Sequence, residues 1–195
     1  MTVAPTVSIV TATYNRSNIL RYTIESVLRQ TYTDWELLVV GDACTDDTEA
    51  VVAQFGDKRI HYMNLEENCG DQSGPNNAAI QMARGQYISF LNHDDLYFQD
   101  HIETSLDEIR TTEADLIFST AAIVQPSRPE SRERDDWDVR ITAATPAGAY
   151  EPYVFSPAST WLMRRDLADQ IGPWCTASET WWMPSQEFLF RAWQS

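Results

Sequence analysis

Apolar and polar residues occur in blocks along the chain, and these blocks predict its secondary structure. Short apolar or β-branched runs are typical of buried strands, whereas apolar residues three or four apart are typical of helices. Strands are predicted over 7–12, 35–40, 59–65, 87–91, 115–123, 150–155 and 159–164. Helices are predicted over 19–30, from a cap at Thr45 or Asp46 through Phe55, and over 77–84, 99–112, 165–171 and 185 onward. Gly85 is expected to end the third helix in the left-handed conformation.

The order of these elements indicates an α/β fold. Strands and helices alternate with short connections in the first half, which predicts a mostly parallel sheet with helices on both faces. The second half is less regular, and its charged, proline-containing segment 126–138 is expected to be a mobile excursion, able to act as a lid. No linker or repeat interrupts residues 1–195, so we expect one domain.

Polar loops follow the predicted strands of the first half. They cover 13–16, 42–47, 68–74 and 92–95. Because the carboxyl ends of parallel strands meet at one edge of a sheet, we expect these loops to converge in a crevice, where open α/β sheets bind ligands.

The segment Tyr87–Asp95 joins a predicted central strand to a polar cluster. Its apolar run leads directly into Asn92, His93, Asp94 and Asp95. Oxygen ligands at a strand tip suit Mg²⁺ or Mn²⁺, especially when phosphates complete the coordination shell. The alternative is a solvated turn in which Asp95 caps the next helix.

The charge balance narrows the ligands that such a crevice can take. The 195 residues include 29 acidic and 14 basic side chains, a formal net charge of −15, and Lys58 is the one lysine. This surface repels nucleic acid and anionic lipid, so we expect no nucleic-acid partner. A nucleotide would need local help from a divalent cation, an arginine or a helix N-terminus.

Cysteine spacing and hydropathy indicate in which cellular compartment the protein is expected. Cys44, Cys69 and Cys175 form no CxxC pair, which favours neither a disulfide framework nor a zinc site. The sequence shows no signal-peptide pattern and no apolar run near the ~18 residues of a membrane span. We therefore expect a cytoplasmic protein. The last predicted helix reaches the end of the sequence uncapped, so we expect a missing C-terminal segment, the one route to membrane association.

Several side chains have two possible roles. Asp42 can bind a base or a ribose hydroxyl, or it can be a turn aspartate. Glu187, in the first turn of the last predicted helix, can be a dipole-stabilised surface acid or a general base. Trp174, Trp181 and Trp182 suit either a core or stacking against sugar faces.

A larger pattern appears when the segments are taken together. Its parts are Val7–Arg16, Leu37–Thr48, Asn68-x-Gly70, Asn77–Ile80, Ala83–Ile88 and Leu91–Asp95. This combination resembles the amino-terminal half of family 2 glycosyltransferases, strongly over about 6–100 and weakly over 100–195. The resemblance implies a GT-A fold, in which a nucleotide-sugar-binding half (about 1–98) joins a smaller, irregular acceptor-binding half (about 99–195). It also implies inverting transfer of a sugar from a nucleotide donor, often a UDP-sugar, with Mg²⁺ or Mn²⁺.

The resemblance assigns donor-site roles by position. Asp42 would bind the base, and Asp94 would bind the metal as part of a DxD-type motif, Asn92-His93-Asp94. Here the motif begins with an amide, which implies weaker metal affinity because one negative charge is lost. The other implied donor-site residues are Thr11, Tyr14 and Asn15 around the nucleoside, and Asn77 and Arg84 in the segment flanking the diphosphate.

The family's base is an acid near the start of the last helix. Glu187 is the one carboxylate after Glu179, so we expect it to be the catalytic base. Its spacing to Arg191 is unusual, and another alignment places Ser185 at this position. The acceptor, a saccharide, a lipid-linked sugar or another hydroxyl compound, would lie against the three tryptophans.

Two other functions fit this layout. A sugar-phosphate nucleotidyltransferase would need a glycine-rich basic loop after the first strand, and 13–16 contains no glycine. A non-catalytic nucleotide-sugar-binding relative is favoured by Asn92 and by the irregular spacing around Glu187. Neither GxGxxG nor GxxxxGK[ST] occurs, which argues against a dinucleotide-type Rossmann enzyme and a P-loop NTPase.

Overall fold

The computed structural model describes residues 4–127, 137–142 and 155–195. Most of the predicted excursion over 126–138 and of the predicted strand over 150–155 lies outside these residues. The elements are β1 (Val7–Thr13), α1 (Ser17–Leu28), β2 (Trp35–Gly41), α2 (Thr48–Ala53), β3 (Ile60–Asn64), α3 (Ser73–Met82), β4 (Tyr87–Phe90), α4 (His101–Thr112), β5 (Leu116–Phe118), β6 (Ala121–Pro126), β7 (Trp137–Thr142), a 3₁₀ turn (Ala158–Thr160), β8 (Trp161–Arg164), α5 (Arg165–Ile171) and α6 (Pro184–Gln194).

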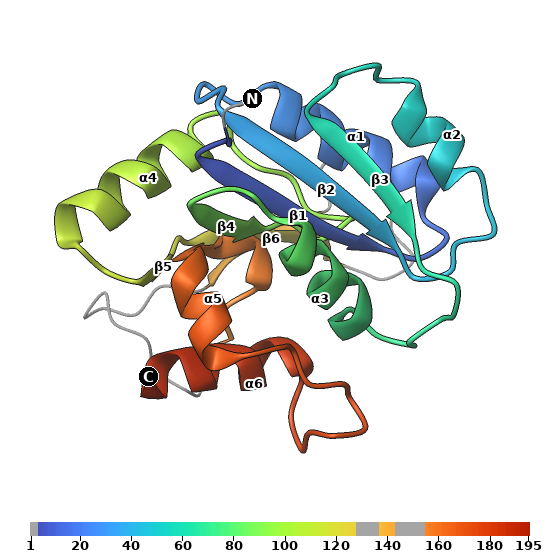
Figure 1. The fold of residues 1–195 in the computed structure, drawn as a ribbon. Coiled ribbons are helices and arrows are strands. Elements are labelled where there is room, and N and C mark those ends of the chain that lie inside the picture. The colour runs from blue at the N-terminus through green and yellow to red at the C-terminus, as the bar shows by residue number, and fades with distance from the viewer. Residues whose placement is uncertain (1–3, 128–136, 143–154) are drawn as a thin grey trace.

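A mostly parallel sheet forms the centre of the molecule (Figure 1). Its strand order is β3-β2-β1-β4-β8-β5, and β1 to β4 run parallel. β8 inserts antiparallel between β4 and β5. The predicted α/β fold with a mostly parallel sheet is therefore confirmed, and the carboxyl ends of β1 to β4 lie on one edge.

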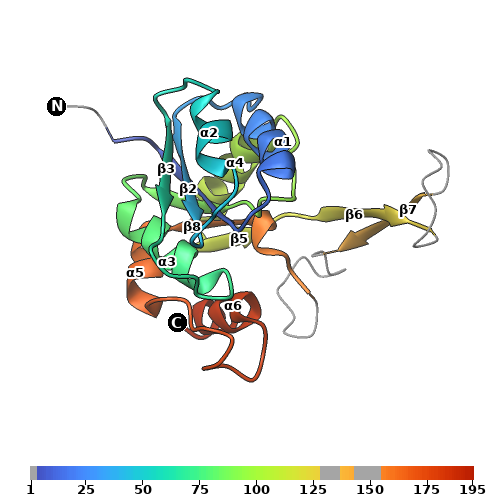
Figure 2. The ribbon, with the colours of Figure 1, turned by 90° about the vertical axis from the view of Figure 1, so that its right-hand side faces the viewer.

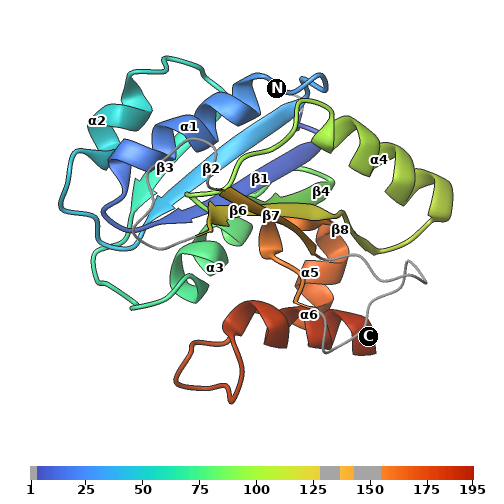
Figure 3. The same ribbon diagram turned by 180° about the vertical axis from the view of Figure 1, so that it is seen from behind.

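Helices cover both faces of this sheet, as Figures 1 and 3 show from opposite sides. Alternate strand residues supply two separate cores because successive side chains point to opposite faces. Val7 and Ile9 of β1 pack with the buried residues of α1, α2 and α4. Val10, the next residue along, packs with α3, α5 and α6.

The second half departs from the sequence prediction at residues 115–123. The single strand expected there is wrong, because β5 joins the main sheet whereas β6 pairs with β7 in a separate two-stranded sheet. Between them, the N–H of Ser119 donates to the carbonyl of Thr160, at 2.9 Å. Figure 2 shows the β6–β7 ribbon projecting from the body of the molecule. Ser119 and Thr120 separate the two strands, but residue types that also occur within strands do not indicate that the chain changes sheet there.

Gly85 has a different role from the one predicted. α3 ends at Met82, and Ala83 is already extended, with φ −61° and ψ 130°. Gly85 is not among the residues with positive φ. Instead, a Cβ at this position would lie 2.5 Å from the backbone nitrogen of Ser8. Glycine is needed here for close packing against β1, not for a left-handed turn.

The described residues contain no helix that is both long and apolar enough to cross a bilayer.

Candidate functional site

Loops after β1, β2, β3 and β4 meet at the predicted edge of the sheet. They line a cavity of about 310 Å³, which we call the strand-end cavity. Its lining residues are Ala12, Thr13, Tyr14, Asp42, Asn68, Gly70, Asp71, Gln72, Pro75 and His93. The predicted convergence of the four loops is confirmed.

Asp42 organises the wall of this cavity. The side chain is buried, and its two carboxylate oxygens accept the N–H groups of Cys69 at 2.7 Å and Gly70 at 3.1 Å. The Asn68 amide donates to the main-chain carbonyl of Asp42 at 2.8 Å. An ionised carboxylate offers about four acceptor positions, so Asp42 can still accept a bond from a ligand. The turn role and the binding role proposed from sequence are therefore compatible.

The end of β1 supplies hydroxyl and aromatic groups. Tyr14 lines the cavity and is about half exposed (49%). Thr13 lines it too, and its buried hydroxyl has no hydrogen-bond partner among the described residues. Thr11, which the resemblance placed at the nucleoside, is fully buried and is not among the residues that line the cavity, and its hydroxyl also lacks a described partner.

Asn15 holds two of the loops together. Its backbone has a φ of 49°, in the left-handed region that asparagine tolerates better than most residues. Its side-chain oxygen accepts the N–H groups of Thr45 at 2.8 Å and Asp46 at 3.2 Å. The structure therefore uses this amide to fasten the β1 loop to the β2 loop.

The turn after β4 contains two carboxylates, of which one is bonded and the other has no partner in the described part of the chain. Asp95 Oδ2 accepts hydrogen bonds from the Asn92 amide at 3.0 Å and the Ser159 hydroxyl at 2.6 Å. His93 approaches the carbonyl of Ala12, with its Nδ1 at 3.2 Å. Asp94 is exposed and makes no hydrogen bond or ion pair with the described residues. Asp94 is therefore the carboxylate of this turn that can bind a cation.

The donor set decides what kind of metal site this turn can form. No cluster of three or more His, Cys, Asp or Glu side chains able to hold a metal occurs in the described parts of the chain. The Asp94 carboxylate and the unused Asn92 side-chain oxygen are hard ligands, which suit Mg²⁺ and Mn²⁺. Mg²⁺ is commonly held by one or two protein carboxylates together with substrate phosphates. The residues fit a cation that arrives with a nucleotide.

Glu187 lies away from the strand-end cavity, near the start of α6. It lines a second cavity of about 550 Å³, the aromatic cavity, with Trp181, Trp182 and Phe190. Its two oxygens accept hydrogen bonds from Arg191, at 2.6 and 2.9 Å. Arg191 also donates to the carbonyl of Pro173. Glu187 is therefore an ion-paired carboxylate at the edge of a cavity.

The three tryptophans have different environments. Trp174 is buried and stacks on Phe188 with ring centroids 4.7 Å apart, so the expectation that it lines an acceptor wall is wrong. Trp181 is fully exposed and Trp182 is mostly exposed, and both line the aromatic cavity. The sequence could not separate them because all three occur in one turn-rich stretch.

Two residues that the resemblance placed at the donor lie elsewhere. Asn77 holds the backbone of Trp174 through its amide, accepting from its N–H at 2.8 Å and donating to its carbonyl at 3.0 Å. Arg84 pairs with the buried Glu36 near the amino end of β2, donating from Nε at 2.8 Å. Arg84 is thus at the sheet edge opposite the strand-end cavity.

Sequence reasoning did not single out Asp71 or Ser159. Asp71 lines the strand-end cavity and bonds to the distant Ala177, and Ser159 holds the Asn92–Asp95 turn. Asp71 lay within a loop already marked as polar, which was a usable signal. Ser159 precedes a strand far along the chain, and nothing in the sequence connects it to Asp95.

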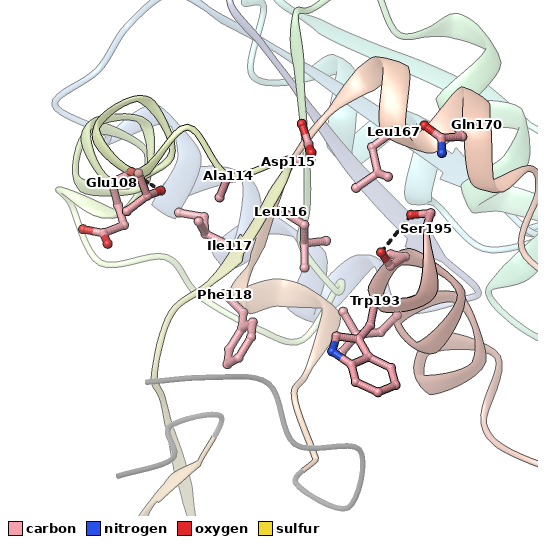
Figure 4. Close-up of a pocket in the computed structure, with 13 residues that line it drawn as sticks. Glu108, Ala114, Asp115, Leu116, Ile117, Phe118, Leu167, Gln170, Trp193 and Ser195 are labelled. Carbon is pink, nitrogen blue, oxygen red and sulfur yellow. Dashed lines mark hydrogen bonds between the residues drawn. The ribbon is translucent and has the colours of Figure 1, made fainter. Parts of the chain in front are cut away.

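A further cavity, of about 520 Å³, lies at the far edge of the sheet (Figure 4). Leu116, Ile117 and Leu167 contribute much of its wall, with Glu108 and Asp115 at its rim. None of the strand-end loops reaches it. Although it is larger, it lacks the convergent polar groups of the strand-end cavity, so we assign the ligand site to the latter.

These features define an α/β protein whose candidate ligand site lies at the carboxyl ends of its strands. The sequence pattern of Glycosyl transferase family 2 matches residues 8–172, and the chain therefore belongs to this family.

Proteins similar to this chain in sequence support the same assignment. The putative teichuronic acid biosynthesis glycosyltransferase TuaG of Bacillus subtilis (strain 168) is 38% identical over 105 residues, which cover 53% of this chain and 41% of that protein. The Escherichia coli protein UDP-Glc:alpha-D-GlcNAc-diphosphoundecaprenol beta-1,3-glucosyltransferase WfgD is 33% identical over 118 residues, covering 60% of this chain and 46% of that protein. The chain thus spans less than half the length of these two relatives.

Solved structures confirm the expected GT-A fold. The crystal structure of S. aureus TarS 1-349 superimposes with a TM-score of 0.76 at 23% identity, covering 95% of this chain and 54% of that one. The mannosyltransferase PcManGT from Pyrobaculum calidifontis, in complex with GDP-Man and Mn²⁺, gives a TM-score of 0.67 at 17% identity, covering 90% and 49%.

Proposed function

We propose that this chain is the donor-binding and catalytic region of an inverting glycosyltransferase that uses a UDP-sugar and a divalent cation. The observation that carries the proposal is the strand-end cavity, where Tyr14 and Asp42 line the wall and the free carboxylate of Asp94 follows His93. A nucleoside in the cavity would place its phosphates toward this turn. Family membership supports the reaction class.

The relatives support UDP as the nucleotide. WfgD is named for UDP-Glc, and TarS has been crystallised with UDP-GlcNAc. PcManGT was crystallised with GDP-Man, so the fold also accommodates a purine nucleotide in that protein. We propose UDP for this chain because WfgD among the sequence relatives and TarS among the solved structures are both described with UDP or a UDP-sugar.

Asp94 would hold the cation, with the Asn92 side-chain oxygen as a second protein ligand. When bound there, such a cation would supply positive charge to offset the negative charge that grows on the departing diphosphate. The protein carries a net charge of −15, which repels an anionic nucleotide diphosphate. A bound cation would offset this repulsion.

Glu187 would act as the base. The acceptor hydroxyl would give its proton to a Glu187 oxygen while its own oxygen bonds to the anomeric carbon of the sugar. The bond from that carbon to the diphosphate breaks on the opposite face, and its electron pair leaves with UDP. Arg191 occupies one acceptor position on each Glu187 oxygen, which leaves others for the hydroxyl.

Trp181 and Trp182 would form the acceptor wall. Indole rings present flat apolar surfaces with a polar N–H, which suits the mixed faces of a saccharide. The acceptor of WfgD, by its name, is a sugar attached to diphosphoundecaprenol. We propose a saccharide acceptor of this lipid-linked class for this chain.

Calorimetric titration with UDP, in the presence and absence of Mn²⁺, tests the donor site. We expect binding that Mn²⁺ tightens by about tenfold or more, equivalent to roughly 1.4 kcal/mol. Failure of UDP to bind under both conditions would refute the proposal.

Hydrolysis or transfer of a UDP-sugar tests the base. Glu187→Gln is expected to lower kcat by about 100-fold or more, the range of general-base contributions, while UDP affinity stays within experimental error. Glu25→Gln is the matched control, since Glu25 and Arg29 form the same i,i+4 pair on the surface of α1.

A second function is favoured by two observations. The Asn92 amide reduces the charge at the metal turn, and Arg191 already pairs with Glu187. Both fit a relative that binds nucleotide sugars without turnover. UDP binding with no hydrolysis or transfer, unaltered by Glu187→Gln, would favour it.

A further inference from the structure

A short chain of hydrogen bonds joins the strand-end cavity to the segment that carries the exposed tryptophans. We call residues 175–183 the aromatic loop. Asp71 Oδ2 accepts the N–H of Ala177 at 2.7 Å, across more than one hundred residues of sequence. Asp71 also lines the strand-end cavity. One carboxylate therefore contacts both regions.

The same series of contacts extends to Asp42, the buried acid of the cavity. Asp42 accepts the N–H of Gly70, and the residue after Gly70 is Asp71. The other oxygen of Asp71 accepts the N–H of Ser73 at 2.7 Å, which fastens it to the start of α3. Movement of the 68–74 loop would thus be transmitted to Ala177 through short, direct contacts.

The root of the aromatic loop is held separately. Asn77 makes two hydrogen bonds to the backbone of Trp174, whose ring lies in the core. Because Trp174 is buried, this end of the aromatic loop is anchored in the core. Ala177, by contrast, is exposed, and within the described residues its bond to Asp71 is the one hydrogen bond between 175–183 and the nucleotide-binding half.

The aromatic loop itself behaves as a small unit. The N–H of Glu179 donates to the carbonyl of Thr176, which closes a turn, and Glu179 Oε2 accepts from the backbone and hydroxyl of Thr176. Trp181 and Trp182 follow directly and line the aromatic cavity. A displacement of Ala177 would carry these rings with it.

We propose that Asp71 is a positioning residue that couples the strand-end cavity to the aromatic loop, so that UDP in the cavity changes the placement of Trp181 and Trp182. The inference rests on the proposed function, because UDP must occupy that cavity. Coupling between two sites is reciprocal, so contacts made by the aromatic loop would also change UDP affinity.

Tryptophan emission tests the coupling directly. We titrate the protein with UDP and Mn²⁺ and follow emission alongside calorimetry. The expected result is an emission change that disappears in the Trp181→Phe, Trp182→Phe double variant, although UDP still binds. UDP binding to the unaltered protein without any such change would overturn the inference.

Asp71→Asn isolates the bond. The remaining oxygen can accept from Ser73, whereas the new amide would face the N–H of Ala177 as a second donor. We expect the emission change to be lost even at saturating UDP and Mn²⁺. Ser73→Ala is the matched control, because it removes a hydroxyl bond to the same carboxylate and leaves the bond to Ala177 intact.

Ala177→Pro removes the donor of the same hydrogen bond, the N–H of Ala177. This variant replaces Asp71→Asn in the test if Asp71→Asn fails to fold. Proline lacks the N–H and is favoured at the second position of a turn, which Ala177 occupies between Thr176 and Glu179. It is expected to behave as Asp71→Asn does. An unaltered emission change in either variant contradicts the coupling. Loss of UDP binding in the unaltered protein is a distinct result, which refutes the strand-end cavity as a UDP site and the coupling with it.

Discussion

The carboxylate of Asp42 accepts the N–H of Gly70 at 3.1 Å, and this bond joins the end of β2 to the loop that closes the strand-end cavity. Gly70 has a φ of 80°, so its conformation is one that other residues rarely adopt. The acid thus shapes the cavity wall and lines it at the same time.

Asp42→Asn is expected to weaken both folding and UDP binding. Asparagine can accept only one of the two N–H groups and presents a donor to the other, which leaves a buried donor unsatisfied. We expect a loss of about 1–3 kcal/mol in the free energy of unfolding, measured in urea at unchanged m-value. Asp107→Asn, at an exposed position on α4, should change the unfolding free energy by less than about 0.5 kcal/mol. Full stability in Asp42→Asn would contradict the bonding that we describe.

Asp94 and Asp95 should respond in opposite ways to the same substitution. Asp94→Asn removes an exposed carboxylate that has no partner among the described residues, so stability is retained but Mn²⁺ no longer tightens UDP binding. Asp95→Asn disturbs the bonds to Asn92 and Ser159 and should lower the free energy of unfolding by about 1–3 kcal/mol. Calorimetry and urea unfolding separate the two effects. An unaltered response to Mn²⁺ in Asp94→Asn would exclude it as the metal ligand.

Glu36 should make folding sensitive to acid. Its burial by itself raises the pKa of the carboxyl, but hydrogen bonds from Ser8 and from the backbone and guanidinium of Arg84 outweigh burial and lower the pKa below its ordinary value of 4.5. The stability that these bonds contribute is present above pH 4.5 and is lost as pH falls through the lowered pKa.

Glu36→Gln checks this linkage. The variant should be less stable at pH 7 by about 1–3 kcal/mol, and its unfolding free energy should fall less between pH 5 and pH 3 than that of the unaltered protein. Urea unfolding across this range measures both quantities. Parallel pH profiles for the two proteins would mean that another carboxylate causes the acid sensitivity. Glu25→Gln, on the surface of α1, should leave the profile unchanged.

Trp174 and Trp181 should differ sharply when each is replaced by alanine. Trp174→Ala opens a cavity in the core beside Phe188, and we expect a loss of about 3–5 kcal/mol in unfolding free energy. Trp181→Ala changes a fully exposed ring and should cost less than about 0.5 kcal/mol. The proposed acceptor wall predicts a raised KM for the acceptor in Trp181→Ala, with donor affinity retained. An unchanged acceptor KM would remove Trp181 from that wall.

Much of the first half of the fold could be predicted from local pattern. Buried strands such as β1 and β2 are short apolar runs, and α1 repeats its apolar residues at helical spacing, so local physics and tertiary packing agree there. The same agreement makes the strand-end loops predictable, because parallel strands must end on one edge. Asp42, Tyr14 and His93 were therefore found in the cavity that the sequence led us to expect.

The sequence by itself sufficed for the order of elements in the first half, the edge where the candidate ligand cavity lies and the polar residues that end each strand, since periodicity and connection length are local properties. The tertiary structure was needed to separate Trp174 from Trp181, to place Arg84 beside Glu36, to leave Asp94 free while Asp95 is bonded, and to bring Asp71 to Ala177. These outcomes depend on which distant segments pack together. Burial and hydrogen-bond partners are consequences of that packing, and residue spacing along a chain does not encode them.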